Sequence, residues 1–218
     1  DEKRDQSYFL FSTSQEQLDY LRFPLGELDK FETRSIAQKL KLNVADKPDS
    51  QDICFVPNGD YSSVIKKFRP ESFKAGNILD ISGNKIGKHE GIINYTIGQR
   101  KGLNIGGTPL PLFIIGTNTQ ENIIYVGQGE DHPGLYRKGL TVKNDDVHWI
   151  REGSKLEIGE SENYQCRIRY RQALTKAKLI QNNNELLISF NIPQRGITPG
   201  QFVAWYKNDE LIGSGVIN

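Results

Sequence analysis

The first sixty residues have a pattern of apolar and polar positions that is typical of short helices joined by loops. Ser14 followed by Gln17, and Asp29 followed by Glu32, are two capping-box patterns, each of which marks the start of a helix. The apolar residues that follow recur at roughly helical spacing: Leu18 and Leu21 after the first box, and Phe31, Ile36, Ala37 and Leu40 after the second. We therefore predict two short helices, with Asn43 as the left-handed residue that ends the second.

The next stretch contains a polar loop, a short apolar run and a third helical pattern. Pro48 excludes a helix from the loop, and the run from Ile53 to Val56 favours a strand. Asp60 is a candidate N-cap for a helix over 61–68. That helix must end before Pro70, because a residue that precedes proline disfavours the helical conformation.

After Pro70 the pattern changes to short apolar runs separated by turn residues, which is typical of β-strands. Two pairs of runs flank a polar connection and are predicted to be hairpins: 78–81 with 85–87, and 112–116 with 123–126. Residues 87–107 contain six glycines, too many for a rigid element. We predict a loop or bulged strands there, with Arg100 and Lys101 on flexible backbone that can approach a ligand.

From about Leu140 the chain has the regular spacing of an antiparallel β unit. Six short runs are predicted to be strands: 155–158, 164–170, 176–180, 186–190, 202–206 and 211–217. Six strands with polar turns favour a small closed barrel or a sandwich. The predicted fold class is mixed α and β, mainly β: a short helical stretch, a β-rich central part and a C-terminal six-stranded antiparallel β-barrel.

The strand predicted at 164–170 carries an arginine at every second position. Its side chains alternate between two faces, with Cys166, Ile168 and Tyr170 on one and Arg167, Arg169 and Arg171 on the other. Three guanidinium groups in a row repel one another unless anions lie opposite. The arginines therefore indicate either a surface that binds nucleic-acid phosphates or a surface stripe paired with Glu157 or Glu162.

Composition and charge narrow the class of protein. The chain has 218 residues, 36% of them hydrophobic and 25% charged, which predicts two or three compact units and excludes wholesale disorder. No apolar run approaches the roughly 20 residues that cross a bilayer, and no secretory signal is recognisable. The chain contains no Met, so we expect a piece of a longer protein.

The formal net charge of +1 hides an uneven distribution. Residues 61–110 carry eight cations and three anions, a net charge of +5, whereas the rest of the chain carries −4. A basic middle suits a partner with a phosphate backbone, although charge alone is more typical of a solvated surface.

Candidate chemistry is scarce. There is no Cys-x-x-Cys motif, the three histidines lie far apart, and neither a phosphate-binding loop nor a Gly-x-Ser-x-Gly elbow is present. Two cysteines cannot build a disulfide framework, so the cytoplasm is the expected compartment. Cys54 is the one candidate nucleophile, because a polar loop that can cover a cleft precedes it. A cysteine between Ile53 and Phe55 is also typical of a buried core thiol, and Asp49 and Asp52 nearby would raise its pKa.

Four motifs, in order and at matching spacing, resemble the bacterial tRNA-specific 2-thiouridylases. They are Arg4-Asp5-Gln6-Ser7-Tyr8-Phe9-Leu10, Phe23-Pro24-Leu25-Gly26, Asp49-Ser50-Gln51-Asp52-Ile53-Cys54-Phe55 and Tyr95-Thr96-Ile97-Gly98-Gln99-Arg100-Lys101-Gly102-Leu103. The similarity runs from end to end of the chain.

In that family an ATP-pyrophosphatase domain uses ATP, with Mg, to adenylate the wobble uridine of tRNA, so that its C2 carries an AMP leaving group. A cysteine persulfide, loaded by a sulfur-donor protein, then supplies sulfur, and a second cysteine resolves the reaction through a disulfide. The resemblance implies that Cys54 is the catalytic persulfide carrier. It also implies tRNA contacts for Arg4, Asp5, Gln6, Arg169, Tyr170 and Gln201.

The chain departs from the family pattern in several places. The ATP-binding loop, the Asn-Pro-Asp segment used at the target base and the second catalytic cysteine are missing, and Cys166 is not assigned that role. The family usually has Lys at the position of Arg4. By resemblance, residues 1–59 are the end of the catalytic domain, 60–140 a central β-rich domain and 141–218 a tRNA-binding barrel. This chain alone is therefore expected to bind tRNA weakly and to be inactive.

Two other classes of protein stay open on the sequence. A non-catalytic RNA-binding module would use the barrel alone. A thiol redox protein would need Cys54 and Cys166 to pair, with their Cα atoms less than about 7 Å apart. We expect the two to lie much farther apart, and we expect neither a metal site in this chain nor a membrane partner.

Overall fold

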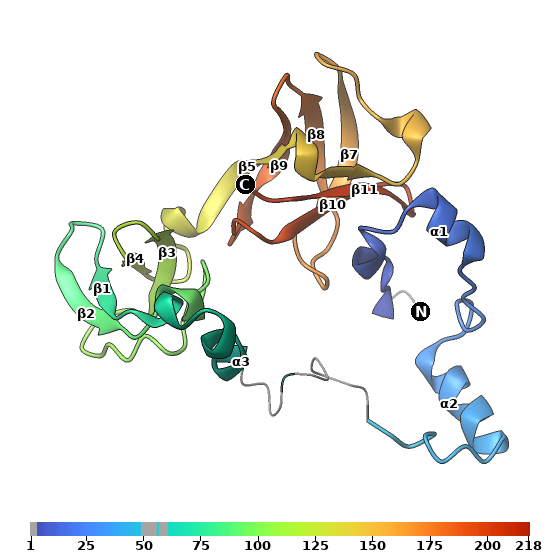
Figure 1. Cartoon of the computed structure of the whole chain (residues 1–218), viewed down its shortest axis with the longest axis horizontal. Helices are drawn as coiled ribbons and strands as arrows, with labels where there is room; N and C mark the ends of the chain where they lie inside the picture. Colours follow the sequence, from blue (N-terminus) through green and yellow to red (C-terminus); the bar gives the residue numbers. More distant parts are fainter. Residues whose placement is uncertain (1–3, 49–55, 57–60) are drawn as a thin grey trace.

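The structure is a computed structural model that describes residues 4–48, 56 and 61–218. Figure 1 shows a helical N-terminal stretch, a small β unit and a larger curled sheet, with the small unit joined to the larger by β5. The fold is therefore mainly β with few helices, as predicted. Of the run predicted to be a strand at 53–56, residues 53–55 lie outside the described residues, as does the proposed cap Asp60, and Val56 lies in a bend.

Both predicted capping boxes are present. α1 (Gln15–Tyr20) follows Ser14, whose Oγ accepts the N–H of Gln17 while the Gln17 side chain accepts the N–H of Ser14. α2 (Lys30–Lys39) follows Asp29, and Glu32 completes the box with both hydrogen bonds at 2.8 Å. These helices therefore begin where local side chains satisfy their free N–H groups.

The prediction that Asn43 ends α2 is wrong. The left-handed residue is Lys41, with φ of 52°. The N–H of Leu42 bonds back across it to the Ala37 carbonyl at 2.9 Å, which is the pattern of a Schellman motif. The chain therefore turns away from the helix axis two residues earlier than predicted.

The helical stretch buries very little. Among residues 4–48 only Tyr8 and Ala45 are buried, and neither α1 nor α2 contains a buried residue. The apolar stripe of α2 is largely exposed at Phe31 and Leu40. No described helix is long and apolar enough to cross a membrane.

The central unit is a four-stranded sheet in the order β2-β1-β4-β3. Both predicted hairpins are confirmed: β1 (Gly76–Leu79) with β2 (Lys85–His89), and β3 (Leu112–Asn118) with β4 (Ile123–Gln128). The parallel pairing of β1 with β4, which joins the hairpins, was not predicted. The third helix is confirmed as α3 (Tyr61–Phe68), and short 3-10 turns lie at Pro70–Phe73 (η4) and Ile92–Asn94 (η5).

The buried side chain of His89 ties this unit together. Its Nε2–H donates to the Asn122 carbonyl at 3.1 Å, and its Nδ1 accepts the N–H of Gly91 at 3.2 Å. Gly76 lies against the same ring: a Cβ there would come within 2.1 Å of the Asn122 carbonyl oxygen and 2.4 Å of His89 Nε2. The position therefore accepts only glycine without movement of the sheet.

The glycine-rich segment 87–107 is mostly loop, as predicted, and it is anchored on β3. The N–H of Gly98 donates to the Ile114 carbonyl at 2.7 Å, and the N–H of Ile114 donates to the Gln99 carbonyl at 3.0 Å. This pairing fixes the middle of the loop, beside the exposed Arg100 and Lys101.

The C-terminal unit is a curled antiparallel sheet of seven strands, called here the half-barrel, in the order β5-β9-β8-β7-β10-β11-β6. Its strands are β5 (Tyr136–Lys143), β6 (Val147–Trp149), β7 (Ser161–Arg167), β8 (Thr175–Gln181), β9 (Glu185–Arg195), β10 (Phe202–Lys207) and β11 (Glu210–Val216). Short 3-10 turns lie at Pro133–Leu135 (η6), Asn144–Asp146 (η7) and Glu152–Ser154 (η8). Its core contains Val142, Ile188 and the fully buried Trp205.

Six strands were predicted, and that count is wrong in two ways. The run 155–158 is a loop, because the Gly159 N–H bonds to the Gln181 carbonyl and the Glu157 N–H to the Glu160 side chain. β5 and β6 were missed, because β5 has the charged Arg137 and Lys138 near its start and β6 has three residues only. The N–H of Asn218 donates to the Thr141 carbonyl at 2.9 Å, which links the C-terminal end to β5.

We predict that Gly76→Ala destabilises the central unit by about 2 kcal/mol or more, because the new Cβ displaces His89 and the Asn122 loop. Unfolding in urea followed by far-UV circular dichroism should shift to lower urea concentration. Both tryptophans, Trp149 and Trp205, belong to the half-barrel, so the tryptophan fluorescence transition should stay in place. Gly106→Ala, where a Cβ meets open space, is the control; equal stability of the two variants would contradict this account of His89.

Candidate nucleic-acid interface

The N-terminal segment packs on the outer surface of the half-barrel, about 160 to 200 residues away in sequence. The Tyr8 hydroxyl of η2 (Ser7–Leu10) donates to the Phe202 carbonyl at 2.9 Å, and its ring packs with Ala204 and Tyr206. Burial raises the pKa of Tyr8, so the phenol stays a neutral donor. The ring of Phe11 stacks on Phe202 with centroids 3.9 Å apart.

Two further hydrogen bonds continue this contact along the chain. The Ser214 hydroxyl of β11 donates to the Phe11 carbonyl at 2.6 Å. The Nε2–H of His148 on β6 donates to the Thr13 carbonyl at 3.0 Å. Residues 8–13 therefore cross the outer face of the half-barrel from β10 to β6, and Figure 1 shows the N-terminal turn beside β10 and β11.

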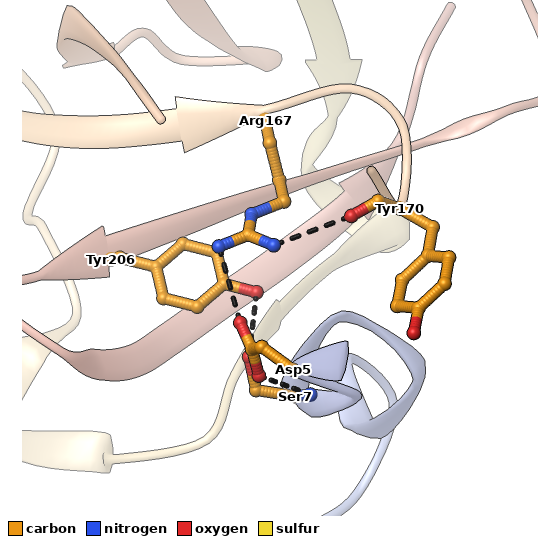
Figure 2. Close-up of polar contacts among 5 residues, drawn as sticks. All are labelled: Asp5, Ser7, Arg167, Tyr170 and Tyr206. Atoms are coloured by element: carbon orange, nitrogen blue, oxygen red, sulfur yellow. Dashed lines mark hydrogen bonds and ion pairs between the residues drawn. The ribbon is translucent and has the colours of Figure 1, made fainter. Parts of the chain in front are cut away.

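Arg167, the last residue of β7, is the centre of a polar network (Figure 2). One nitrogen, Nη2, lies 3.2 Å from Asp5 Oδ2, and the other, Nη1, donates to the Tyr170 carbonyl at 3.3 Å. The guanidinium carbon lies 4.8 Å from the centre of the Tyr206 ring. Only 12% of the Arg167 side chain is exposed. The network joins the N-terminal segment, β10 and the turn after β7.

Asp5 and Ser7 complete this network with two further hydrogen bonds. Oδ1 of Asp5 accepts the N–H of Ser7 at 2.8 Å, and the Ser7 hydroxyl shares a hydrogen bond with the Tyr206 hydroxyl at 3.2 Å. Burial acts to raise the pKa of Asp5, but the hydrogen bonds from Ser7 and the charge of Arg167 outweigh it, so the pKa lies below its ordinary value. The carboxylate is therefore ionised and paired at neutral pH.

The predicted stripe of three arginines on one strand face is wrong. β7 ends at Arg167 because the side chain of Gln172 accepts the N–H of Ile168 at 2.8 Å and closes a turn over 168–171. Arg167 pairs with Asp5 rather than with Glu157 or Glu162, and Glu162 pairs with Lys207 instead.

The other two arginines lie in the turn after β7. The exposed Arg169 donates from Nη2 to the Gly196 carbonyl at 3.0 Å, and the Arg171 guanidinium lies 5.9 Å from the Tyr170 ring centre. Gly196 has φ of 71°, and a Cβ there would lie 2.7 Å from Arg169 Nη2. Glycine at this position therefore gives the Arg169 side chain the space for its contact.

The central unit meets the half-barrel at the same place. An added Cβ at Gly98 of the glycine-rich loop would lie 3.9 Å from Gly196 Cα, and the Arg195 guanidinium lies 5.2 Å from the Phe113 ring centre. The loop that carries Arg100 and Lys101 therefore approaches the half-barrel beside Arg169.

The six residues for which tRNA contacts were predicted lie around the N-terminal turn η2. Arg4 and Gln6 are exposed, and Asp5 contacts Arg167. The Tyr170 ring packs on Phe9 with centroids 4.5 Å apart, and Arg169 precedes it in the turn. Gln201 immediately precedes Phe202, the partner of Tyr8.

A groove of about 700 Å³ opens alongside these residues. It lies between η2, the loop at Phe23 and Gly26, and the side chains of Arg167 and Tyr206.

Sequence reasoning missed Tyr8 and Tyr206 as parts of this site. A signal was available in β10, whose residues are apolar on both faces: Val203 and Trp205 point into the core, and Phe202, Ala204 and Tyr206 point outward. A strand that is apolar on its outer face must be covered, so this pattern indicates a contacting segment.

The structure describes one of the two cysteines. Cys54 lies outside the described residues, so its predicted role and its distance from Cys166 stay predictions. Cys166 is fully buried in the half-barrel core, and burial raises the pKa of its thiol, which disfavours the reactive thiolate.

The starts of α1 and α2 do not offer a free phosphate site. The N–H groups at the start of α1 and α2 are capped by Ser14 and by the Asp29 carboxylate, which would repel phosphate. Within the described part of the chain, no three histidine, cysteine, aspartate or glutamate side chains gather as a metal would require.

Comparison with known proteins gives matches over almost the whole chain. Three family models match in order: the tRNA methyl transferase HUP domain at residues 1–58, the tRNA methyl transferase PRC-barrel domain at 62–128 and the aminomethyltransferase β-barrel domain at 137–217.

Similar full-length proteins include the tRNA-specific 2-thiouridylases MnmA of Christiangramia forsetii and Flavobacterium johnsoniae, with 44% and 43% identity over all of this chain. The protein of the same name from Rickettsia massiliae is 43% identical over the same span. The chain covers 63%, 63% and 58% of the length of these relatives.

We predict that Tyr8→Phe destabilises the half-barrel by about 1 kcal/mol, because the partly buried Phe202 carbonyl loses its donor while the packing of the ring is kept. Urea unfolding followed by tryptophan fluorescence measures this change. Tyr20→Phe is the control, because Tyr20 is 83% exposed. Identical unfolding of the two variants would show that η2 does not stabilise the half-barrel.

Proposed function

Because this chain belongs to the tRNA-specific 2-thiouridylase family, we propose that it is the sulfur-carrying and RNA-binding part of a tRNA uridine 2-sulfurtransferase. The enzyme converts the wobble uridine of tRNA to 2-thiouridine. Identity of 42–44% over the whole chain supports the proposal, and so does the Asp-Ser-Gln-Asp-Ile-Cys motif at residues 49–54.

The observation that carries the RNA-binding half of this proposal is the gathering of distant segments around η2. Residues 4–6, Arg169, Tyr170 and Gln201 are far apart in sequence, yet they surround one apolar contact on the half-barrel. The exposed guanidinium of Arg169 can bind a phosphate, and the half-exposed ring of Tyr170 can pack on a base or a ribose. Backbone contact and stacking suit a folded RNA.

The chemical half of the proposal rests on Cys54. The terminal sulfur of a persulfide on Cys54, loaded by a sulfur-donor protein, attacks C2 of a uridine whose C2 oxygen is bonded to AMP, so that AMP leaves and C2 is bonded to Cys54 through two sulfur atoms. The thiolate of the second cysteine of the family pattern, which this chain lacks, then attacks Cys54 Sγ; the S–S bond breaks, 2-thiouridine leaves and a disulfide with Cys54 forms. A persulfide is more acidic than a thiol, which offsets the effect of Asp49 and Asp52 on its ionisation. Adenylation needs ATP, and because the starts of α1 and α2 are already capped, we assign no part of that step to them.

We expect the complete enzyme to act in the cytoplasm and this chain alone to bind tRNA without thiolating it. The runner-up function, a non-catalytic RNA-binding module, is favoured by one observation: the interface around η2 is formed without Cys54.

We predict that Arg169→Ala weakens tRNA binding about tenfold and lowers the slope of log K against log salt concentration by about one, because one phosphate contact is lost. Fluorescence anisotropy with labelled tRNA over a range of salt concentrations measures both quantities. The control is Lys178→Ala, which removes an exposed cation in the middle of β8. A slope unchanged by Arg169→Ala would assign that arginine to the structure alone.

We predict that Cys54→Ser in the complete enzyme abolishes 2-thiouridine formation and leaves tRNA affinity unchanged, because the sulfur carrier is lost while the interface around η2 is kept. Nucleoside mass spectrometry after incubation with ATP, sulfur donor and tRNA measures the product. Cys166→Ser is the matched control and should keep activity in the folded fraction. Full activity of Cys54→Ser would favour the RNA-binding module, and thiolation by the 218-residue chain alone would contradict its proposed inactivity.

A further inference from the structure

We propose that Asp5 and Arg167 form a positioning pair that sets the RNA-binding turn and does not itself contact RNA. The pair joins residues 4–6 to the turn 168–171, which carries Arg169 and Tyr170. The inference rests on the proposed RNA-binding function, and it gives Asp5 a role different from the direct contact that the resemblance implies.

The contacts of Arg167 leave little of its guanidinium for a phosphate. Nη2 faces Asp5, Nη1 donates to the Tyr170 carbonyl, and one face of the group lies over the Tyr206 ring. The Nε atom is buried, with no hydrogen-bond partner among the described residues. With 12% of the side chain exposed, the charge is held inside the protein surface.

The contacts of Asp5 also argue against a direct role in binding RNA. One carboxylate oxygen accepts the Ser7 N–H and the other faces Arg167 (Figure 2). An ionised carboxylate at the edge of an RNA-binding surface repels phosphate. The position of Asp5 beside Arg4 and Gln6 is therefore explained by its ion pair with Arg167. The Arg167 guanidinium in turn donates a hydrogen bond to the Tyr170 carbonyl.

This arrangement reverses the direction in which Asp5→Asn is expected to change the affinity for tRNA. By charge alone, Asp5→Asn removes an anion from the interface and should tighten the binding of a polyanion. If Asp5 positions Arg167, the same change releases the guanidinium and the Tyr170 turn, and binding becomes weaker. The slope of log K against log salt stays unchanged, because no phosphate contact belongs to either residue.

The experiment measures tRNA affinity and salt slope for the 218-residue chain and for Asp5→Asn, Arg167→Gln and the double variant. We expect each single variant to bind about five-fold more weakly with an unchanged slope, and the double variant to bind no more weakly than the worse single. Glu162→Gln is the matched control: it also removes one anion from an ion pair, at 38% exposure against 36% for Asp5, and its affinity should stay unchanged.

Several outcomes would overturn the proposal. The first is tRNA binding by Asp5→Asn that is tighter than, or equal to, that of the unmodified chain. The second is a loss of affinity in the double variant that equals the sum of the two single losses. The third is a salt slope lowered by about one in Arg167→Gln, because Arg167 would then contact a phosphate. A purely structural role would lower the unfolding midpoint without changing the affinity of the folded fraction, which circular dichroism quantifies.

A further variant covers the case in which Arg167→Gln does not fold. Arg167→Lys keeps the charge beside Asp5 and loses the second donor to the Tyr170 carbonyl, so it should bind more weakly with an unchanged slope. Wild-type affinity in this variant would overturn the proposal. Absence of tRNA binding by the unmodified chain would instead contradict the proposed function, so the two failures are distinguishable.

Discussion

The structure of the interface depends on one constraint: β10 is apolar on both faces. Val203 and Trp205 fill the core of the half-barrel, so Phe202, Ala204 and Tyr206 face outward and must be shielded from water. Residues 8–13 provide that cover, with the Tyr8 hydroxyl on the Phe202 carbonyl as its central hydrogen bond. The polar network at Asp5 and the contacts at Ser214 and His148 lie around this apolar contact.

This cover makes the surface for which we propose RNA binding a product of the whole chain. One part comes from the N-terminus, one from the turn after β7 and one from the start of β10. The glycine-rich loop of the central unit reaches the same region, where a Cβ added at Gly98 would lie 3.9 Å from the Cα of Gly196. Segments from distant positions can therefore present charge and aromatic surface together, which suits a large folded RNA better than a small ligand.

The helical stretch, unlike the two sheets, has no core of its own among the described residues. α1 and α2 are well capped, yet neither has a buried residue, and no described residue covers the apolar stripe of α2. Short helices gain most of their stability from packing of an apolar face rather than from propensity. This exposed apolar surface lies within residues 1–58, the part of the chain that matches a HUP-domain model. The chain covers 63% of the length of the Christiangramia forsetii relative.

Local sequence patterns were enough to predict the features that depend on neighbouring residues. The capping boxes at Ser14 and Asp29 and the hairpins β1–β2 and β3–β4 are local patterns, and all are present in the structure. Family motifs in the sequence also pointed to the residues around η2. The folded packing decides that β5 and β6 complete the sheet and that Arg167 pairs with Asp5. These features arise between residues far apart in the chain, so no local spacing encodes them, and only the folded packing selects the partner.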